Sequence, residues 1–228
     1  MATKPAVVVC DSSVLFPIVL VNRFDLLRMI RDRYAIQPLI HEAVHAEIQR
    51  LLGKWHKDRV GAFQKCLRTG AVKTLDEESL SDAGFNPADA VIDQIDELGA
   101  RFNALAVDRG EAYTHAAGNV LKVPTFSQDI RALQRLKEAG YYAERPILRL
   151  FDLLALAFQV GQLDGRECHK TVRALIDLGE AVPACFTNCG FEDGLRSYFP
   201  RLIDSVLDRV GLQEPPGHFD DRLIIAPK

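Results

Sequence analysis

Short apolar runs alternate with amphipathic stretches along most of the chain. The run Ala6–Cys10 has no polar interruption, which is typical of a strand buried on both faces. Ala35–Ile40 and Leu121–Phe126 are predicted as further strands, and Tyr142–Leu148 as an extended segment. Strands that alternate with helices favour a parallel sheet joined by crossover helices. The pattern therefore predicts an α/β fold.

Apolar residues recur at three-to-four spacing between these strands, which predicts amphipathic helices. The predicted helices span Val14–Asp32, His41–Leu52, two or three segments between Gly61 and Ala106, then Asp108–Gly118, Asp129–Ala139, Leu150–Gln162 and Glu167–Leu178. Gly53 is expected to end the second helix, and the turn-rich stretch 81–87 to interrupt the region that follows.

Beyond Pro183 the character of the chain changes. A stretch rich in Cys, Phe and Gly precedes one more predicted helix, Leu195–Val210. We therefore expect an α/β/α sandwich with a central, mostly parallel sheet in residues 1–182, and a C-terminal extension of unassigned role in residues 183–228.

Composition places the chain among ordinary globular proteins. Of its 228 residues, 48% are hydrophobic and 26% are charged, so neither disorder nor a fibrous repeat is expected. The N-terminal segment lacks a signal-peptide core, and no apolar run approaches the roughly 18 residues of a membrane span. These features predict a cytoplasmic protein without a membrane partner.

The five cysteines are scattered and odd in number, which argues against a disulfide framework. Cys185 and Cys189, with Cys168 and His169 upstream, form an alternative zinc pattern, but their spacing departs from the usual C-x2-C pairs. Buried free thiols are the preferred interpretation.

Acidic residues occupy the ends of predicted elements. Asp11 closes the first strand, and Asp129 follows the apolar run that ends at Phe126. Because functional groups in an open α/β sheet gather beyond the carboxyl ends of the strands, these two acids are expected to face one crevice. Glu47 and Glu111 lie in predicted helices that flank it.

Each acid also has a purely structural interpretation. Asp108 and Glu111 match a capping box, Asp11 and Asp129 could cap the helices that follow them, and Glu47 could be surface charge. A cluster of carboxylates, however, is unfavourable unless a cation or protons neutralise it. Mg²⁺ and Mn²⁺ prefer such oxygen ligands, which indicates phosphate-ester cleavage.

Four short segments carry a family resemblance. Val7–Ser13, Ala43–Glu47, Asp108–Ala112 and Thr125–Asp129 resemble the motifs of PIN-domain nucleases, and the resemblance covers roughly residues 6–182. It implies a PIN-like fold in which Asp11, Glu47, Glu111 and Asp129 are catalytic and bind Mg²⁺ or Mn²⁺. It also implies that Ser12 and Ser127 hydrogen-bond a metal ligand or the substrate phosphate, and that Asp108 orients water molecules near the metal. Gln128 stands where many members carry Asp or Asn, and Glu111 where an Asp is often found.

The resemblance implies a metal-dependent endoribonuclease, a hydrolase that cleaves phosphodiester bonds. The expected substrate is single-stranded RNA, because a flexible strand can bring a phosphate into a recessed pocket. Arg131 and Arg135 lie one helical turn apart beside Asp129 and are the first candidates to hold it.

Similar small PIN proteins are commonly toxins restrained by an antitoxin protein, and homodimers are common among them. One alternative is a noncatalytic PIN-like module that binds RNA or a protein. A metal-assisted phosphatase is another, although no Gly-rich phosphate loop supports it.

Overall fold

The computed structural model describes residues 6–105, 107–141, 143, 145 and 147–198. The chain divides into two compact units, Met1–Leu148 and Arg149–Lys228, and each is described by itself. The first unit contains the sheet and the four candidate acids. The domain boundary expected near residue 182 stays a prediction.

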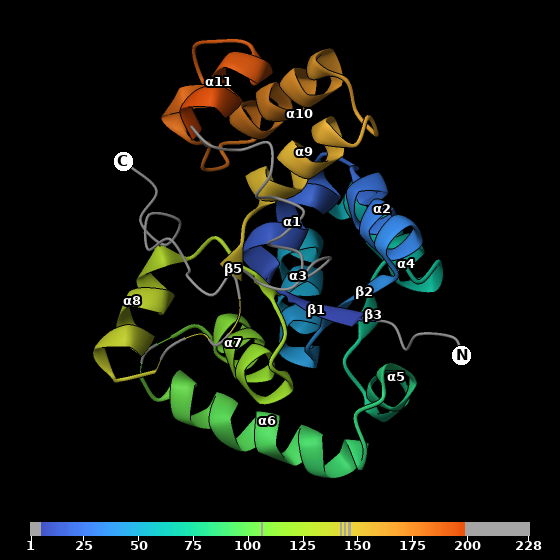
Figure 1. Ribbon diagram of the computed structural model, residues 1–228, viewed down its shortest axis with the longest axis vertical. Coiled ribbons are helices and arrows are strands. Elements are labelled where there is room, and N and C mark those ends of the chain that lie inside the picture. The colour runs from blue at the N-terminus through green and yellow to red at the C-terminus, as the bar shows by residue number, and fades with distance from the viewer. Residues whose placement is uncertain (1–5, 106, 142, 144, 146, 199–228) are drawn as a thin grey trace. The chain divides into compact units, whose positions relative to one another are not determined.

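A five-stranded sheet forms the centre of the first unit (Figure 1). Its strands are β1 (Ala6–Cys10), β2 (Ile36–Ile40), β3 (Lys73–Thr74), β4 (Thr125–Phe126) and β5 (Ile147–Leu148). Their order is β3-β2-β1-β4-β5, and all four pairings are parallel. This arrangement confirms the α/β class and the expected parallel sheet.

Helices occupy both faces of this sheet. Those of the first unit are α1 (Ser12–Leu20), α2 (Phe24–Tyr34), α3 (Glu42–Trp55), η1 (Lys57–Arg59), α4 (Val60–Arg68), α5 (Glu77–Ala83), α6 (Ala88–Asn103), α7 (Arg109–Leu121) and α8 (Ile130–Glu138). The chain moves from β1 to β2 and β3 in one direction, then crosses back to β4 and β5. Because parallel crossovers are right-handed, α1–α4 belong to one face and α5–α8 to the other.

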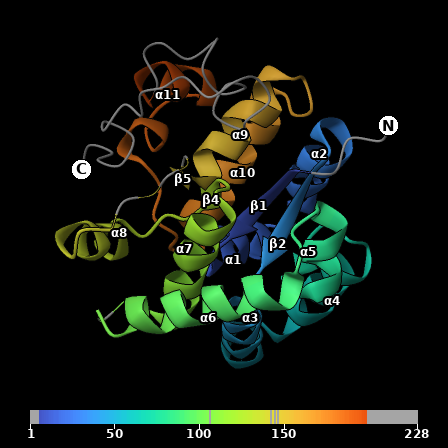
Figure 2. The same cartoon turned by 60° about the horizontal axis from the view of Figure 1, so that its bottom comes forward.

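The core on the second face follows from the alternation of side chains along β1. Val7 and Val9 are buried in one cluster with Ile95 and Phe102 of α6 and Leu136 of α8. Figure 2 shows α6 and α7 side by side. An α/β/α layering is therefore consistent with the first unit, and it leaves the carboxyl ends of the strands open to polar groups.

Several boundaries differ from the sequence prediction. The helix expected to end at Gly118 continues to Leu121, so the strand expected at Leu121–Phe126 has only Thr125–Phe126. The segment predicted as one helix, Val14–Asp32, is α1 and α2, separated by a turn in which Asn22 has φ 55°. Gly53 lies inside α3 and does not end it, since a glycine ends a helix only where it adopts the left-handed conformation. As a consequence α3 extends to Trp55.

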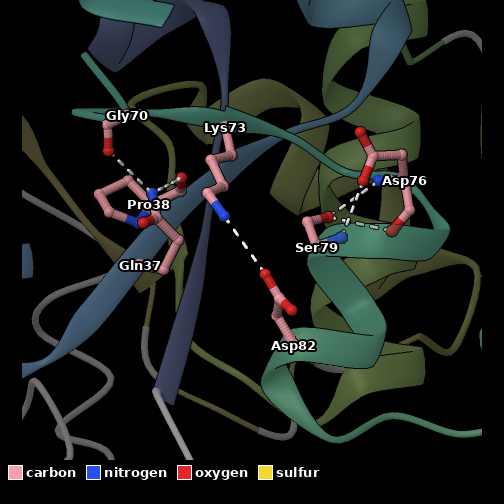
Figure 3. A network of polar contacts seen from close by, with 7 residues as sticks. All are labelled: Gln37, Pro38, Gly70, Lys73, Asp76, Ser79 and Asp82. Carbon is pink, nitrogen blue, oxygen red and sulfur yellow. Dashed lines mark hydrogen bonds and ion pairs between the residues drawn. The ribbon is translucent and has the colours of Figure 1, made fainter. Parts of the chain in front are cut away.

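Polar contacts join β2, β3 and α5 near the amino-terminal end of the sheet (Figure 3). Lys73 Nζ lies 3.4 Å from Asp82 Oδ2, and Gln37 Nε2 donates to Gly70 O at 3.3 Å. A hollow of about 270 Å³ lies beside these residues and Ser79. Gln37, Lys73 and Ser79 all have protein partners, and the Lys73–Asp82 ion pair is the contact among them that joins α5 to the sheet.

The second unit is helical in its described part. It contains α9 (Leu150–Gln159), α10 (Gly165–Asp177), η2 (Ala184–Phe186) and α11 (Phe191–Tyr198). Phe186 stacks on Phe151 and Phe191, with ring centroids 5.0 and 5.3 Å apart. The helix predicted at Leu195–Val210 lies mostly outside the described residues. All five cysteines are free.

No helix in the described part of the chain is both long and apolar enough to cross a membrane.

Candidate metal centre

The strand order reverses between β1 and β4, and the candidate acids gather at this point. Crossover helices leave β1 and β4 toward opposite faces, and in open α/β sheets ligands bind beyond the carboxyl ends of the strands at such a switch point. The Cys10–Phe126 register aligns the ends, and Asp11 N–H donates to Phe126 O at 2.8 Å. Asp11 therefore lies beside the segment that carries Asp129.

Asp11 is fully buried and caps α1. The backbone N–H of Ser13 donates to its Oδ2 at 2.9 Å, whereas Oδ1 is buried and finds no hydrogen-bond donor. Burial raises the pKa of Asp11 to about 6; the hydrogen bonds of Ser13 act in the opposite direction, and the charge of Glu47 adds to the rise. Oδ2 thus caps the helix, and Oδ1 remains available to a ligand.

Glu47 reaches this point from α3 across the surface of Gly110, in the first turn of α7. A Cβ placed on Gly110 would lie 2.6 Å from Glu47 Oε2 and 3.7 Å from Asp11 Oδ1. Both carboxylate oxygens therefore lie within 4 Å of one small spot on α7, and only a glycine leaves room for them there.

Glu111 follows directly and is buried. The capping box does not form, because the Asp108 side chain makes no cap bond. Burial raises the pKa of Glu111 to about 10, and the charges of Asp11 and Asp129 and a hydrogen bond with Asp129 add to the rise. Burial beside other carboxylates therefore favours the protonated form of Glu111.

Asp129 caps α8, which is the structural one of the two roles expected for it, helix cap and metal ligand. Its Oδ1 accepts from Arg131 N–H at 2.6 Å and Ala132 N–H at 3.0 Å. The preceding Gln128 ties the ends of β1 and β4 together: its backbone N–H donates to Ser13 Oγ and its side-chain amide to Ser13 O, both at 2.9 Å. Gln128 thus has a structural role here.

The remaining predicted residues take varied positions. Ser127 is buried, and its Oγ accepts from Asp129 N–H at 3.3 Å. Ser12 is buried at the start of α1, and Asp108 is exposed but close enough to raise the pKa of Glu111. Arg131 and Arg135 are exposed on α8. Their expected roles stay predictions.

Two buried histidines near the centre are absent from the sequence prediction. His115 lies four residues after Glu111 in α7; its Nε2 has no hydrogen-bond partner, and burial lowers its pKa to about 4. His41 follows β2, accepts from Ala43 N–H through Nδ1, and stacks on Tyr113 with centroids 4.4 Å apart. Only the i, i+4 spacing of Glu111 and His115 could have indicated the first.

His41 braces the helix that carries Glu47. Its Nε2 lies 3.3 Å from Asp96 Oδ1, and since Nδ1 accepts a hydrogen bond, Nε2 carries the proton. The ring thereby connects the start of α3 to α6 and, through Tyr113, to α7. This fixes the helices of Glu47 and Glu111 relative to each other.

Within the described ranges, no group of three or more His, Cys, Asp or Glu side chains is arranged to hold a metal ion. Carboxylates that repel one another separate or take up a proton, and the raised pKa of Glu111 agrees with this. The bare, buried Asp11 Oδ1 beside Glu47 nevertheless fits a hard cation, because an unpaired buried carboxylate oxygen is costly.

Comparisons with protein families, with characterised proteins and with solved structures found no match.

Proposed function

We propose that the protein is a divalent-metal-dependent endoribonuclease that hydrolyses phosphodiester bonds in single-stranded RNA. The observation that carries the proposal is the buried Asp11 Oδ1, which lacks a donor yet lies beside Glu47 and close enough to Glu111 to raise its pKa. Buried polar atoms in folded proteins are nearly always hydrogen-bonded. A buried carboxylate oxygen without a donor therefore supports a ligand-binding role.

Asp11 and Glu47 would hold the Mg²⁺ or Mn²⁺ ion, and Glu111 and Asp129 would complete its carboxylate surroundings. When bound, such an ion lowers the pKa of water and neutralises charge on a phosphate. Because the protonated form of Glu111 is favoured without a metal, a bound cation would release that proton to solvent. Ser13 and Gln128 hold the two strand ends in place during this exchange.

Burial of the acids would also strengthen their interaction with a bound cation. Glu111 is 6% exposed and Asp11 0%, so electrostatic interactions at the centre act with little screening by solvent. We further propose, from the resemblance to PIN-domain nucleases, that an antitoxin protein restrains the enzyme and that it forms a homodimer.

The proposal is tested by cleavage of an end-labelled single-stranded RNA with Mg²⁺ or Mn²⁺. Wild type should cut the RNA, and both EDTA and the Asp11→Asn variant should abolish the cut. A folded wild-type protein that cleaves no RNA with either metal would refute the nuclease and favour a binding module. Cleavage that survives both EDTA and Asp11→Asn would place the chemistry elsewhere.

A further inference from the structure

Beyond Glu47, the surface of α3 carries basic and aromatic side chains. Arg50 and Lys54 follow Glu47 by three and seven residues, which places the three side chains on one side of the helix. Trp55, the last residue of the helix, lies about 100° further around the axis, and the Lys54 side chain reaches its ring. At about 1.5 Å per residue, Trp55 lies about 12 Å along the axis from Glu47.

Trp55 is the most exposed of the large hydrophobic side chains described, at 58%. The ammonium of Lys54 lies 4.5 Å from the centroid of its ring. An indole normally contributes its large apolar area to a core or an interface, so this degree of exposure leaves a surface on which a planar group can stack. The neighbouring cation favours a partner that is both aromatic and anionic.

The charge around Trp55 agrees with such a partner. Arg50, Lys54 and Lys57 form no ion pair with another described residue, whereas Arg59 pairs with Asp58 at 3.2 Å. The whole chain carries a net charge of −3, whereas these three residues make the surface around Trp55 locally positive. Favourable interaction with the helix dipole explains Lys54 in the last turn, but it does not explain an exposed indole beside it.

We propose that the C-terminal half of α3 binds single-stranded RNA, with a base stacked on Trp55 and phosphates on Lys54 and Arg50. The inference rests on the proposed function, because the same helix carries Glu47 and the bound strand would run along it to the acids. The 12 Å separation corresponds to about three or four stacked nucleotides at about 3.4 Å each. Duplex RNA is disfavoured, since its bases are not free to stack on a side chain.

Trp55 is the only tryptophan in the chain, so its fluorescence reports on this surface directly. The full-length Asp11→Asn variant in EDTA would be titrated with a short single-stranded RNA, an abasic strand of the same length, and a duplex. Single-stranded RNA should quench the emission, with an affinity that falls as salt rises. The abasic strand and the duplex should leave the emission nearly unchanged.

Affinity measured by anisotropy of a labelled RNA provides the second readout. Trp55→Ala should bind about 5- to 150-fold more weakly, as expected for the loss of one stacked base, and Trp55→Phe should retain most of the affinity. Leu178→Ala removes another exposed apolar side chain and is the matched control, which should bind as the parent does. In the active protein, Trp55→Ala should raise KM and leave kcat unchanged.

Equal affinity of Trp55→Ala and the parent protein, or equal quenching by the abasic strand, would overturn the proposal. So would a shift in Trp55 emission caused by a co-purifying protein and not by RNA. Cleavage is scored separately: RNA that quenches Trp55 but is never cut refutes the nuclease and leaves the binding face in place. RNA that is cut without quenching refutes the binding face alone.

Discussion

Gly110 offers the sharpest perturbation of the candidate metal centre. In Gly110→Ala the new Cβ would lie 2.6 Å from Glu47 Oε2, whereas ordinary contacts begin at 3.4 Å. The carboxylate must therefore retreat by about 0.8 Å (3.4 minus 2.6 Å) to reach an ordinary contact, while Val44, at 3.5 Å, needs no movement. The far end of a glutamate side chain moves easily, so the fold should accept the change.

The expected loss lies in metal affinity and not in stability. Divalent cations such as Mg²⁺ require ligand oxygens in near-ideal positions, and misplacing the support of one ligand typically costs about 10- to 100-fold in affinity. Replacing a helical glycine by alanine stabilises by up to about 1 kcal/mol, which partly offsets any strain. Melting temperature should thus stay equal or rise slightly while metal binding weakens.

Calorimetric titration with Mn²⁺ measures this effect. Gly53→Ala is the matched control, because it makes the same substitution inside α3 with no atom within 4 Å of the new Cβ. Its affinity should match wild type. In a Glu47→Ala background, Gly110→Ala should have no further effect, since the two residues act through the same carboxylate. Unaltered Mn²⁺ affinity in Gly110→Ala, with wild type binding normally, would refute this reasoning.

Three further predictions follow from the protonation and hydrogen bonds of the centre. Metal affinity should increase with pH between about 6 and 10, with about one proton released per ion at pH 7.5, because the pKa of Glu111 is raised to about 10; identical heats in buffers of different ionisation enthalpy would contradict this. A raised carboxyl pKa stabilises the fold most below the ordinary value of 4.5, and this contribution is lost as pH rises toward 10. Glu111→Gln should therefore stabilise the metal-free protein at pH 7.5, on the order of 2 kcal/mol, and a lower midpoint in chemical denaturation would exclude the proposed burial cost. Ser13→Ala removes the acceptor for Gln128 N–H and should cost about 1–2 kcal/mol by the same assay; an unchanged midpoint would show that the bridge between β1 and β4 is dispensable.

The sequence predicted those parts of the site that depend on local pattern. Asp11 and Asp129 were expected beyond strand ends because a largely apolar stretch precedes each, and both acids do occupy helix N-caps there. β1 spans its apolar run, whereas β4 covers only the last two residues of the second stretch. The capping box of Asp108 and Glu111 was wrong, because a cap pattern cannot reveal that Glu111 has a tertiary partner in Asp129.

Other features depend on contacts between distant segments and left no local signal. β3 has only two residues, too few for a hydrophobic period, and it forms because β2 offers it a parallel partner. The brace of His41, Asp96 and Tyr113 joins three helices, and the space above Gly110 exists only once α3 packs on α7. Such features require the folded arrangement before they can be recognised.

The most direct test of the central claim is a crystal of the full chain soaked in Mn²⁺ and measured for anomalous scattering. We predict one or two peaks enclosed by Asp11, Glu47, Glu111 and Asp129, with Asp11 Oδ1 as a direct ligand, and loss of the peaks in Asp11→Asn crystals. An ordered crystal at saturating Mn²⁺ with no peak at these carboxylates would contradict the account.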